Sequence, residues 1–322
     1  MKIFSFFFGL CFFLLLASAA PAAPKGTTYP EKAIKVISSW PGGGGGDQEI
    51  RAICLYLKKY LKAEIIIENV PGADTRIALT KAWKAKPDGY TLIYISPPQP
   101  ILNEYLFQTE YRTKDFVPIY SFFNRVVTMT VPADTWRDFD EFAKDVRGKS
   151  LAIGLSSFGS ASHVNAIGVA KELGINAKWI PYATGSQAVT QLAGKHIDVA
   201  FTMGTTALSL ILSGKIRPLL QFSEVRAAGF ESVPNPKEKG YRIPMLTGLG
   251  GFVAPPKTPN AVVKVLEEAF DKVSHDPEFL DWTQKTAHDM LRLRSDAFKK
   301  KLLEQYRIVE ESIPLVKQTM GK

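Results

Sequence analysis

The chain has 322 residues, which is more than one hydrophobic core usually supports, so its length predicts two domains. Its formal net charge of +9 comes from 40 Lys and Arg set against 31 Asp and Glu, and these charges are scattered along the chain. Scattered charges lack the clustered basic patch of a nucleic-acid-binding surface, so we expect no nucleic acid among the partners. Most of the basic residues are expected to be solvated, and the mild positive potential would help to collect small anions.

The first 22 residues predict a secretory signal peptide. Met1 and Lys2 give a short basic start, residues 3–16 form an apolar run, and small residues follow at 17–22. The apolar run is too short to remain as a membrane anchor, and no later stretch reaches about 18 consecutive apolar residues. We therefore expect a periplasmic protein that is cleaved near residue 22.

After the signal peptide the chain alternates between short β-branched strands and amphipathic helices. The first set predicts strands at 34–38, 64–68 and 90–95, with helices at 47–62 and 75–85. An extended segment at 126–131 precedes a second set, with strands at 151–155, 177–182, 197–202 and 216–222 and helices at 161–173, 186–193 and 205–212. Such alternation predicts parallel sheets covered by helices on both faces.

The last part of the chain is expected to return to the first sheet. A short strand at 252–254 and a proline-rich turn at 255–259 precede a helix capped by Asn260, and another helix begins near Ser295. This order predicts an α/β protein with two lobes, two crossing strands and a cleft between the lobes. We assign residues 23–124 and 247–322 to lobe 1 and residues 125–246 to lobe 2.

A glycine-rich loop follows the first predicted strand. Pro41 precedes five glycines at 42–46, and Asp47 is expected to cap the next helix. Backbone N–H groups of such a loop can bind an anion at the helix N-terminus. The loop fits neither nucleotide pattern, because it lacks both the Lys-Ser/Thr of a P-loop and the third glycine of the dinucleotide fingerprint. Flexibility alone is the competing interpretation; as binding residues we predict Trp40, Gly43, Gly44 and Gly45.

The loop after the second strand, at 69–76, is a second candidate. Gly72 can adopt a positive φ, and Thr75 can cap the following helix. Asp74 is either a cap or a group that binds an amine or hydroxyl of a ligand. Arg76 either pairs with a carboxylate or is a solvated residue of the first helical turn. Ser96, directly after the third strand, is a further candidate.

Three polar loops of the second set also follow strands. The loop at 156–163 carries four hydroxyl groups and a glycine before a helix, which is typical of an anion cradle, and shorter polar loops lie at 184–186 and 202–206. Since ligands bind at the carboxyl ends of strands in open parallel sheets, we expect all five loops to face one site. The binding candidates here are Ser156, Ser157, Ser160, Ser162, Thr184, Thr202 and Met203.

No catalytic residue, cofactor or metal site is predicted. The chain has four His, a single Cys after the signal peptide, and no paired ligand spacing such as His-Glu-x-x-His. The serine-rich loop lacks the Gly-x-Ser-x-Gly pattern, although a secreted serine hydrolase remains an alternative. We interpret His163 as a capping or packing residue and Cys54 as a buried apolar residue.

At these loops the sequence resembles the substrate-binding receptors of tripartite tricarboxylate transporters, the Bug/TctC type. The family pattern Pro-Gly-Gly-Gly-x-Asp appears at 41–47 with one extra residue, and Glu-Asn-x-Pro-Gly-Ala appears at 68–73. Pro-Asp-Gly-Tyr-Thr-Leu is unaltered at 87–92. Further matching stretches follow in family order, at 115–118, 159–163, 181–182, 214–217 and 254–255.

The resemblance implies a type II periplasmic-binding-protein fold, a Venus flytrap that closes on di- or tricarboxylates, aromatic acids or amino acids. It implies that amides of the loops at 40–46 and 72–76 hold one ligand carboxylate, and that the serines at 156, 157, 160 and 162 recognise the rest. It further implies a monomer without a cofactor that delivers its ligand to the membrane permease subunits of a tripartite tricarboxylate transporter. A sensor that feeds a two-component signalling system is the alternative with the same fold.

One departure from the family concerns the second loop. The family commonly has Gly-Ala-Gly-Gly where this chain has Gly72, Ala73, Asp74 and Thr75. Two side chains therefore occupy positions that are bare backbone in the family. This difference predicts a ligand with a donor group, which Asp74 would bind.

Overall fold

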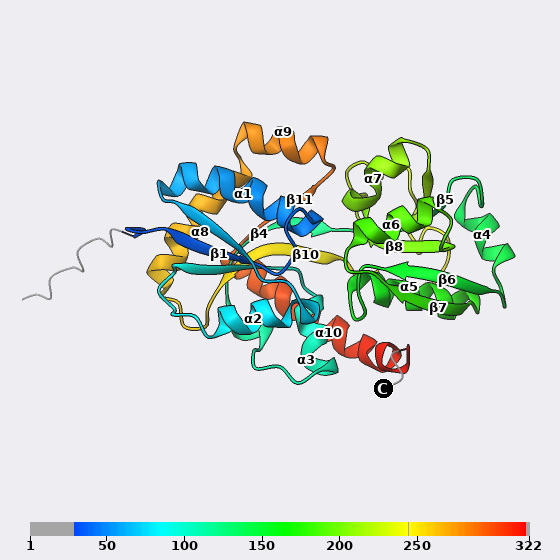
Figure 1. The fold of residues 1–322 in the computed structure, drawn as a ribbon, viewed down its shortest axis with the longest axis horizontal. Helices are drawn as coiled ribbons and strands as arrows, with labels where there is room; N and C mark the ends of the chain where they lie inside the picture. Colours follow the sequence, from blue (N-terminus) through cyan, green and yellow to red (C-terminus); the bar gives the residue numbers. More distant parts are fainter. Residues whose placement is uncertain (1–28, 244, 320–322) are drawn as a thin grey trace, which may run out of the picture.

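The structure is a computed structural model that describes residues 29–243 and 245–319. Its elements form two α/β lobes that lie side by side along the longest axis (Figure 1). The expected signal peptide at 1–22 lies outside the described residues. Within those residues, no helix combines the length and the apolar character needed to cross a membrane.

The first lobe contains a sheet of six strands in the order β11-β4-β10-β3-β1-β2. Successive side chains of each strand point to opposite faces. Val36 and Leu92 therefore pack with α1, α8 and α9, whereas Ile37 and Ile93 pack with α2, α3 and α10. The strands are β1 (Ile34–Ser38), β2 (Ile65–Asn69), β3 (Thr91–Ile95), β4 (Val117–Arg125), β10 (Gly248–Ala254) and β11 (Asp289–Arg294). The helices are α1 (Gly45–Leu61), α2 (Arg76–Trp83), α3 (Gln99–Leu106), α8 (Asn260–Ser274), α9 (Pro277–Lys285) and α10 (Ser295–Thr319).

The second lobe contains a sheet of five strands in the order β7-β6-β8-β5-β9. Val199 of β8 packs with α5 on one face, and the next residue, Ala200, packs with α6 and α7 on the other. The strands are β5 (Val127–Pro132), β6 (Ser150–Leu155), β7 (Asn176–Pro181), β8 (Val199–Met203) and β9 (Ile216–Gln221). The helices are α4 (Phe139–Asp145), α5 (Ala161–Leu173), α6 (Gly185–Ala193) and α7 (Gly204–Leu212).

The expectation of wholly parallel sheets is wrong. β1 is parallel to β2 and β3, and β6 is parallel to β7 and β8. β10 is antiparallel to β3 and β4, and β5 is antiparallel to β8 and β9. The chain path explains the difference, because β4 ends at Arg125 and the chain continues almost directly into β5 of the other sheet. β10 and β5 each enter their sheet from the other lobe, and each is therefore antiparallel to its neighbours β3 and β8, which follow helices of their own lobe.

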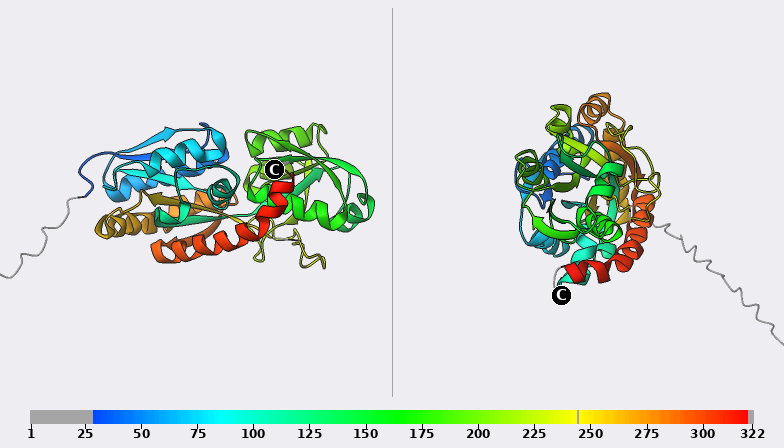
Figure 2. Two further views of the ribbon diagram at one scale, coloured as in Figure 1. Left: turned by 90° about the horizontal axis from the view of Figure 1, so that it is seen from below. Right: turned by 90° about the vertical axis from the view of Figure 1, so that its right-hand side faces the viewer.

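The last helix, α10, makes a further contact between the lobes. Figure 2 shows it running from the first lobe to a position beside the second. Its first part packs on β4 and α3, and its last part packs on α5. Near its end, Oγ1 of Thr319 lies 3.2 Å from Nε2 of His163 on α5. The two lobes are therefore linked by two chain crossings and by this helix.

Several element boundaries differ from the expectation. The first helix begins at Gly45 with Gly44 as its N-cap, so Asp47 does not cap it, and Pro259 rather than Asn260 is the N-cap of α8. The sequence did not predict α3, β4, α4, α9 or β11. For β4 the reason is burial on both faces, which removes the alternating pattern that marks a strand.

The contact between β10 and β3 depends on Gly250. A Cβ atom at this position would lie 2.1 Å from Oη of Tyr94, which is fully buried. We expect Gly250→Ala to lower the free energy of unfolding by about 1–3 kcal/mol, because overpacking forces a close-packed core to shift. Urea denaturation measures the change, with Gly42→Ala as control, since a Cβ atom there meets nothing within 4 Å. Equal stability of the two variants would contradict this account.

Candidate functional site

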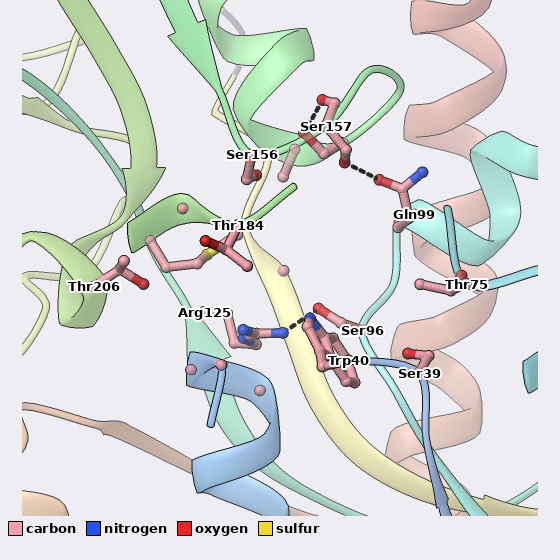
Figure 3. A pocket seen from close by; sticks show the side chains of 18 of the residues that line it. Ser39, Trp40, Thr75, Ser96, Gln99, Arg125, Ser156, Ser157, Thr184 and Thr206 are labelled. Carbon is pink, nitrogen blue, oxygen red and sulfur yellow. Dashed lines mark hydrogen bonds between the residues drawn. The ribbon is translucent and has the colours of Figure 1, made fainter. Parts of the chain in front are cut away.

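A cavity of ≈ 140 Å³ lies between the lobes, where loops after β1, β2, β3, β6, β7 and β8 meet. Side chains and backbone from both lobes line it, and Figure 3 shows them pointing toward one space. Of the binding residues predicted from the sequence, the structure brings these to the cavity: Trp40, Gly44, Gly45, Thr75, Ser96, Ser156, Ser157, Ser160, Thr184 and Met203. The remaining candidates lie off its lining: Gly43, Asp74, Arg76, Ser162 and Thr202.

The glycine-rich loop places the N-terminus of α1 at the cavity. The N–H groups of Gly45 and Gly46 have no acceptor within the helix because they lie in its first turn, and no side chain caps the helix in their place. The partial positive charge of this helix end favours a bound anion. The first-lobe side of the cavity therefore offers backbone donors without a competing side-chain acceptor at the cap.

Asp47 holds the glycine-rich loop in place through hydrogen bonds to its carboxylate. Its carboxylate is fully shielded from solvent and accepts hydrogen bonds from the backbone N–H of Gly43 (2.9 Å), from Nε of Arg51 (2.7 Å) and from Nδ2 of Asn69 (2.6 Å). Burial raises the pKa of Asp47, but these hydrogen bonds outweigh burial, so the pKa lies below its usual value. The ionised carboxylate holds Gly43 away from the cavity.

Trp40 forms one wall of the site. Its indole lies so close to Gly46 that a Cβ atom there would be 2.5 Å from the ring. The indole also packs edge-on against the ring of Tyr94, with 5.8 Å between centroids. The glycine run therefore has a steric role, because it admits a large aromatic ring beside the helix N-terminus.

Three consecutive residues of the second loop adopt left-handed backbone conformations. The φ angle is 46° at Ala73, 49° at Asp74 and 75° at Thr75. This conformation costs an L-residue about 1–2 kcal/mol and is rarest for a β-branched residue such as Thr. Backbone strain of this kind persists where the surrounding structure enforces it, and it is concentrated at functional sites.

The side chains of Asp74, Thr75 and Arg76 lie in different surroundings. Thr75 lines the cavity, and its Oγ1 is shielded from solvent without a hydrogen-bond partner among the described residues. Asp74 is exposed, and Nδ2 of Asn103 donates to its backbone carbonyl (2.6 Å). Arg76 donates from Nε to the carbonyl of Ala73 (2.9 Å), and its guanidinium stacks 3.7 Å from the centroid of the Phe107 ring. Of the three consecutive residues Asp74, Thr75 and Arg76, the cavity lining includes Thr75 alone.

The serine-rich loop forms part of the second-lobe wall. Ser160 caps α5 by accepting from the backbone N–H of His163 (3.3 Å), and it donates to the carbonyl of Ser157 (2.9 Å). Oγ of Ser157 donates across the cleft to Oε1 of Gln99 (3.0 Å), as Figure 3 shows. Ser162 is buried within α5 and is not part of the cavity lining. The loop thus contributes both cavity hydroxyls and a direct contact with lobe 1.

His163 has a packing role. Its ring lies between Phe158 and Trp179, with centroid distances of 5.0 and 5.3 Å, and its Nδ1 accepts from the backbone N–H of Gly159 (3.1 Å). Burial lowers the pKa of His163 to about 4, so the ring is neutral. Its other nitrogen faces Thr319 and is not aimed at a serine. Across the described chain, no three His, Cys, Asp or Glu side chains gather as a metal site requires.

Two more helices of the second lobe begin at the cavity. Thr184 caps α6 by accepting from the backbone N–H of Gln187 (3.2 Å), and α7 begins after Met203 without a side-chain cap. Thr206, in the first turn of α7, lines the cavity, whereas Thr202 is buried in β8. The N-termini of α5, α6 and α7 therefore face that of α1 across the cavity.

Six polar lining side chains are not among the binding residues predicted from the sequence: Ser39, Tyr94, Gln99, Arg125, Ser186 and Thr206. Gln99 begins α3 directly after Pro98, and a proline at a helix start is a recognisable signal. Ser186 and Thr206 lie in the polar loops at 184–186 and 202–206, which the sequence does indicate. Arg125 ends the buried strand β4 and carries no local signal, yet it is the only charged residue that lines the cavity in the described part of the chain.

A buried carboxylate holds Arg125 in place. Glu49 of α1 accepts from Oη of Tyr94 (2.7 Å) and has its Oε1 3.4 Å from both Nε of Arg125 and Nε2 of His288. Burial raises the pKa of Glu49, but Arg125 and His288 outweigh burial, so the pKa lies below its usual value. The carboxylate is therefore ionised and fixes the guanidinium at the point where the chain crosses between the lobes.

Two α/β lobes that enclose a cavity lined by helix N-termini define a solute-binding protein of the two-lobed periplasmic class. The family model described as tripartite tricarboxylate transporter family receptor, TctC, matches residues 50–316. The chain belongs to this family, whose members are periplasmic solute-binding receptors and not enzymes.

Known relatives cover most of the chain. The Cupriavidus necator protein named UPF0065 protein in gbd 5'region is 30% identical over 275 residues, which is 81% of this chain and 80% of that protein. A TctC solute binding protein from Polaromonas, solved without ligand, is 27% identical with a TM-score of 0.73 and covers 89% of this chain and 99% of its own. MatC from Rhodopseudomonas palustris with bound malate has the same fold, with 22% identity, a TM-score of 0.79, and coverage of 88% of this chain and 100% of its own.

Strain at Thr75 predicts opposite effects of one substitution on stability and on binding. We expect Thr75→Gly to raise the free energy of unfolding by about 1 kcal/mol, because relief of the left-handed strain exceeds the entropy that glycine adds to the unfolded chain. The same variant should bind ligand less tightly, since it loses a hydroxyl at the cavity. Thr75→Ser, which keeps the hydroxyl, is the control for binding. Calorimetric melting curves check the prediction, and a loss of stability in Thr75→Gly would contradict it.

Proposed function

We propose that this chain captures a small carboxylate between its lobes and delivers it to the membrane permease subunits of a tripartite tricarboxylate transporter. One observation carries the proposal: helix N-termini from both lobes, among them those of α1, α5, α6 and α7, converge on a cavity that has no acidic lining residue in the described part of the chain. Each helix end favours negative charge. Family membership and the malate bound to MatC support the class of ligand.

The ligand is expected to bridge the lobes. On the first lobe, the amides of Gly45 and Gly46 and the hydroxyl of Thr75 would hold one carboxylate. On the second lobe, the hydroxyls of Ser156 and Thr184 would bind the remaining polar groups. A hydrogen bond to a charged group contributes about 1.5–3 kcal/mol, so a few such contacts suffice for the ~8 kcal/mol of a micromolar complex after the costs of association.

Lobe closure is expected to occur about the chain crossings. We take residues 23–124 and 247–322 as lobe 1 and residues 125–246 as lobe 2. The sheet composition supports this division, because β4 and β10 belong to the first sheet and β5 to β9 belong to the second. Proteins with two lobes and a short hinge close around a ligand in this way. Because α10 contacts both lobes, closure would also require this helix to bend or slide.

The proposed location is the periplasm, reached by a signal peptide at residues 1–22. The proposed functional unit is a monomer that needs no cofactor, because a single chain supplies both walls of the cavity. Release of the ligand to a permease would then require only that the lobes open.

Binding can be tested with the mature chain from residue 23 and a panel of small acids that includes malate, succinate and adipate. At a hundredfold excess of ligand over Kd, linkage adds about 2.7 kcal/mol to stability, which should raise the Tm of a chain of about 300 residues by about 4 °C. No chemical turnover of the acid should be detected by NMR. A panel in which no acid shifts the Tm would contradict the proposed function.

The contact between Gln99 and Ser157 is expected to stabilise the closed state. Gln99→Ala removes this hydrogen bond and should speed ligand release about 2- to 10-fold, since a neutral hydrogen bond contributes about 0.5–1.5 kcal/mol. Stopped-flow tryptophan fluorescence can follow release, because Trp40 lines the cavity. Gln284→Ala, at an exposed position on α9, is the matched control. Identical release from the two variants would rule out this role.

A further inference from the structure

Arg125 occupies a distinctive position at the base of the cavity. It is the last residue of β4, at the first crossing between the lobes, and its side chain is only 10% exposed. Figure 3 shows its guanidinium in the middle of the site, between Trp40 on one side and Thr184 on the other. A ligand held here would therefore touch the point about which the lobes close.

The guanidinium has unused hydrogen-bonding capacity. Its Nη1 donates to Oγ of Ser96 (2.7 Å), and its Nε faces Glu49 at 3.4 Å. The indole of Trp40 lies 5.5 Å from its central carbon. An arginine carries five N–H donors in a planar fork, and the structure gives this one no further hydrogen bond within the described residues. The remaining donors suit the two oxygens of a carboxylate.

Glu49 positions Arg125 but neutralises the charge of the guanidinium only in part. The carboxylate of Glu49 also accepts from Tyr94 and faces His288, so its negative charge is shared among three partners. These groups come from α1, β3, β4 and the turn before β11, and they prevent the guanidinium from turning toward solvent. Asp289, next to His288, accepts from Nδ2 of Asn124 rather than from Arg125.

Among the described residues, the cavity lining also lacks a carboxylate that could pair with an ammonium group. Asp74, the candidate for that role from the sequence, is exposed and lies off the lining. No other acidic residue of the described chain lines the cavity. An ammonium group on the ligand would therefore meet helix N-termini and Arg125, which all repel it.

We propose that Arg125 binds one carboxylate of the ligand directly, and that the site selects acids without an amino group. This inference rests on the proposed function and narrows it. Arg125 is thus a specificity-determining residue as well as a binding residue.

The selection is tested by isothermal titration of the mature chain with matched pairs of acids. Succinate and L-aspartate differ by one amino group, as do glutarate and L-glutamate. We expect the amino acid of each pair to bind at least about 10-fold more weakly, because an unpaired charge at a desolvated site is costly. Malate and adipate extend the panel in polarity and length.

The direct contact is tested with Arg125→Gln. We expect affinity for the best acid to fall about 10- to 100-fold, the loss that corresponds to a hydrogen-bonded charged group. Arg147→Gln removes an exposed arginine in the turn between α4 and β6, outside the cavity, and serves as the matched control, with unchanged affinity. Because Arg125→Gln leaves Glu49 without its cation, the double variant Glu49→Gln, Arg125→Gln removes both charges and should show the same loss. Circular dichroism confirms that each variant is folded.

The outcomes separate the inference from the proposed function. If the wild-type chain binds no acid in the panel, both are overturned. If it binds an acid and the folded double variant binds it equally well, the contact with Arg125 is overturned while the receptor function stands. If aspartate binds as tightly as succinate, the selection against amino groups is overturned.

Discussion

The ionised carboxylate of Glu49 is the constraint on which the region between the lobes depends. A buried charge is costly unless it is paired and hydrogen-bonded, and Glu49 meets this requirement with partners from separate elements: Tyr94, Arg125 and His288. These contacts tie α1 to β3, to the end of β4 and to the turn before β11. Because β4 leads into the second lobe, a single buried charge fixes both the start of the crossing and the orientation of the arginine beside the cavity. The close approach of β10, made possible by Gly250, completes the enclosure.

Around Glu49 and Arg125, backbone amides and side chains contribute differently to the site. Asp47 takes up the loop amide of Gly43, which leaves the first-turn amides of α1 directed at the cavity. On the opposite lobe, Ser160 and Thr184 satisfy the caps of their own helices, so the helix ends keep their positive character without a charged residue. Amides supply attraction for any anion of suitable size, because they do not distinguish one carboxylate from another. Discrimination must therefore come from the few side chains with a fixed charge or shape.

Much of this arrangement could be predicted from the sequence, because strand, polar loop and helix follow one another locally. For that reason the glycine-rich and serine-rich loops are recognisable in the sequence, and residues of both line the cavity. Arg125 could not be predicted, since it follows an aromatic strand and reaches the site only through the crossing between sheets. Asp74 was expected in the site because it lies in a candidate loop. Its side-chain direction depends on three consecutive positive φ angles, which a sequence with Ala, Asp and Thr at these positions does not indicate.

The same strained loop explains the departure from the family pattern. Where the family has glycine, a left-handed backbone is free of steric cost, whereas this chain accepts strain at Asp74 and Thr75 and gains a hydroxyl at the cavity. That hydroxyl lacks a partner within the described protein, and a buried unpaired group is itself destabilising. A ligand that accepts from Thr75 would remove the second cost, whereas the backbone strain stays in the bound state. The Thr75 hydroxyl therefore acts in the same direction as Arg125: each offers the cavity a fixed donor, and an anion that accepts from both would favour closure of the lobes around it.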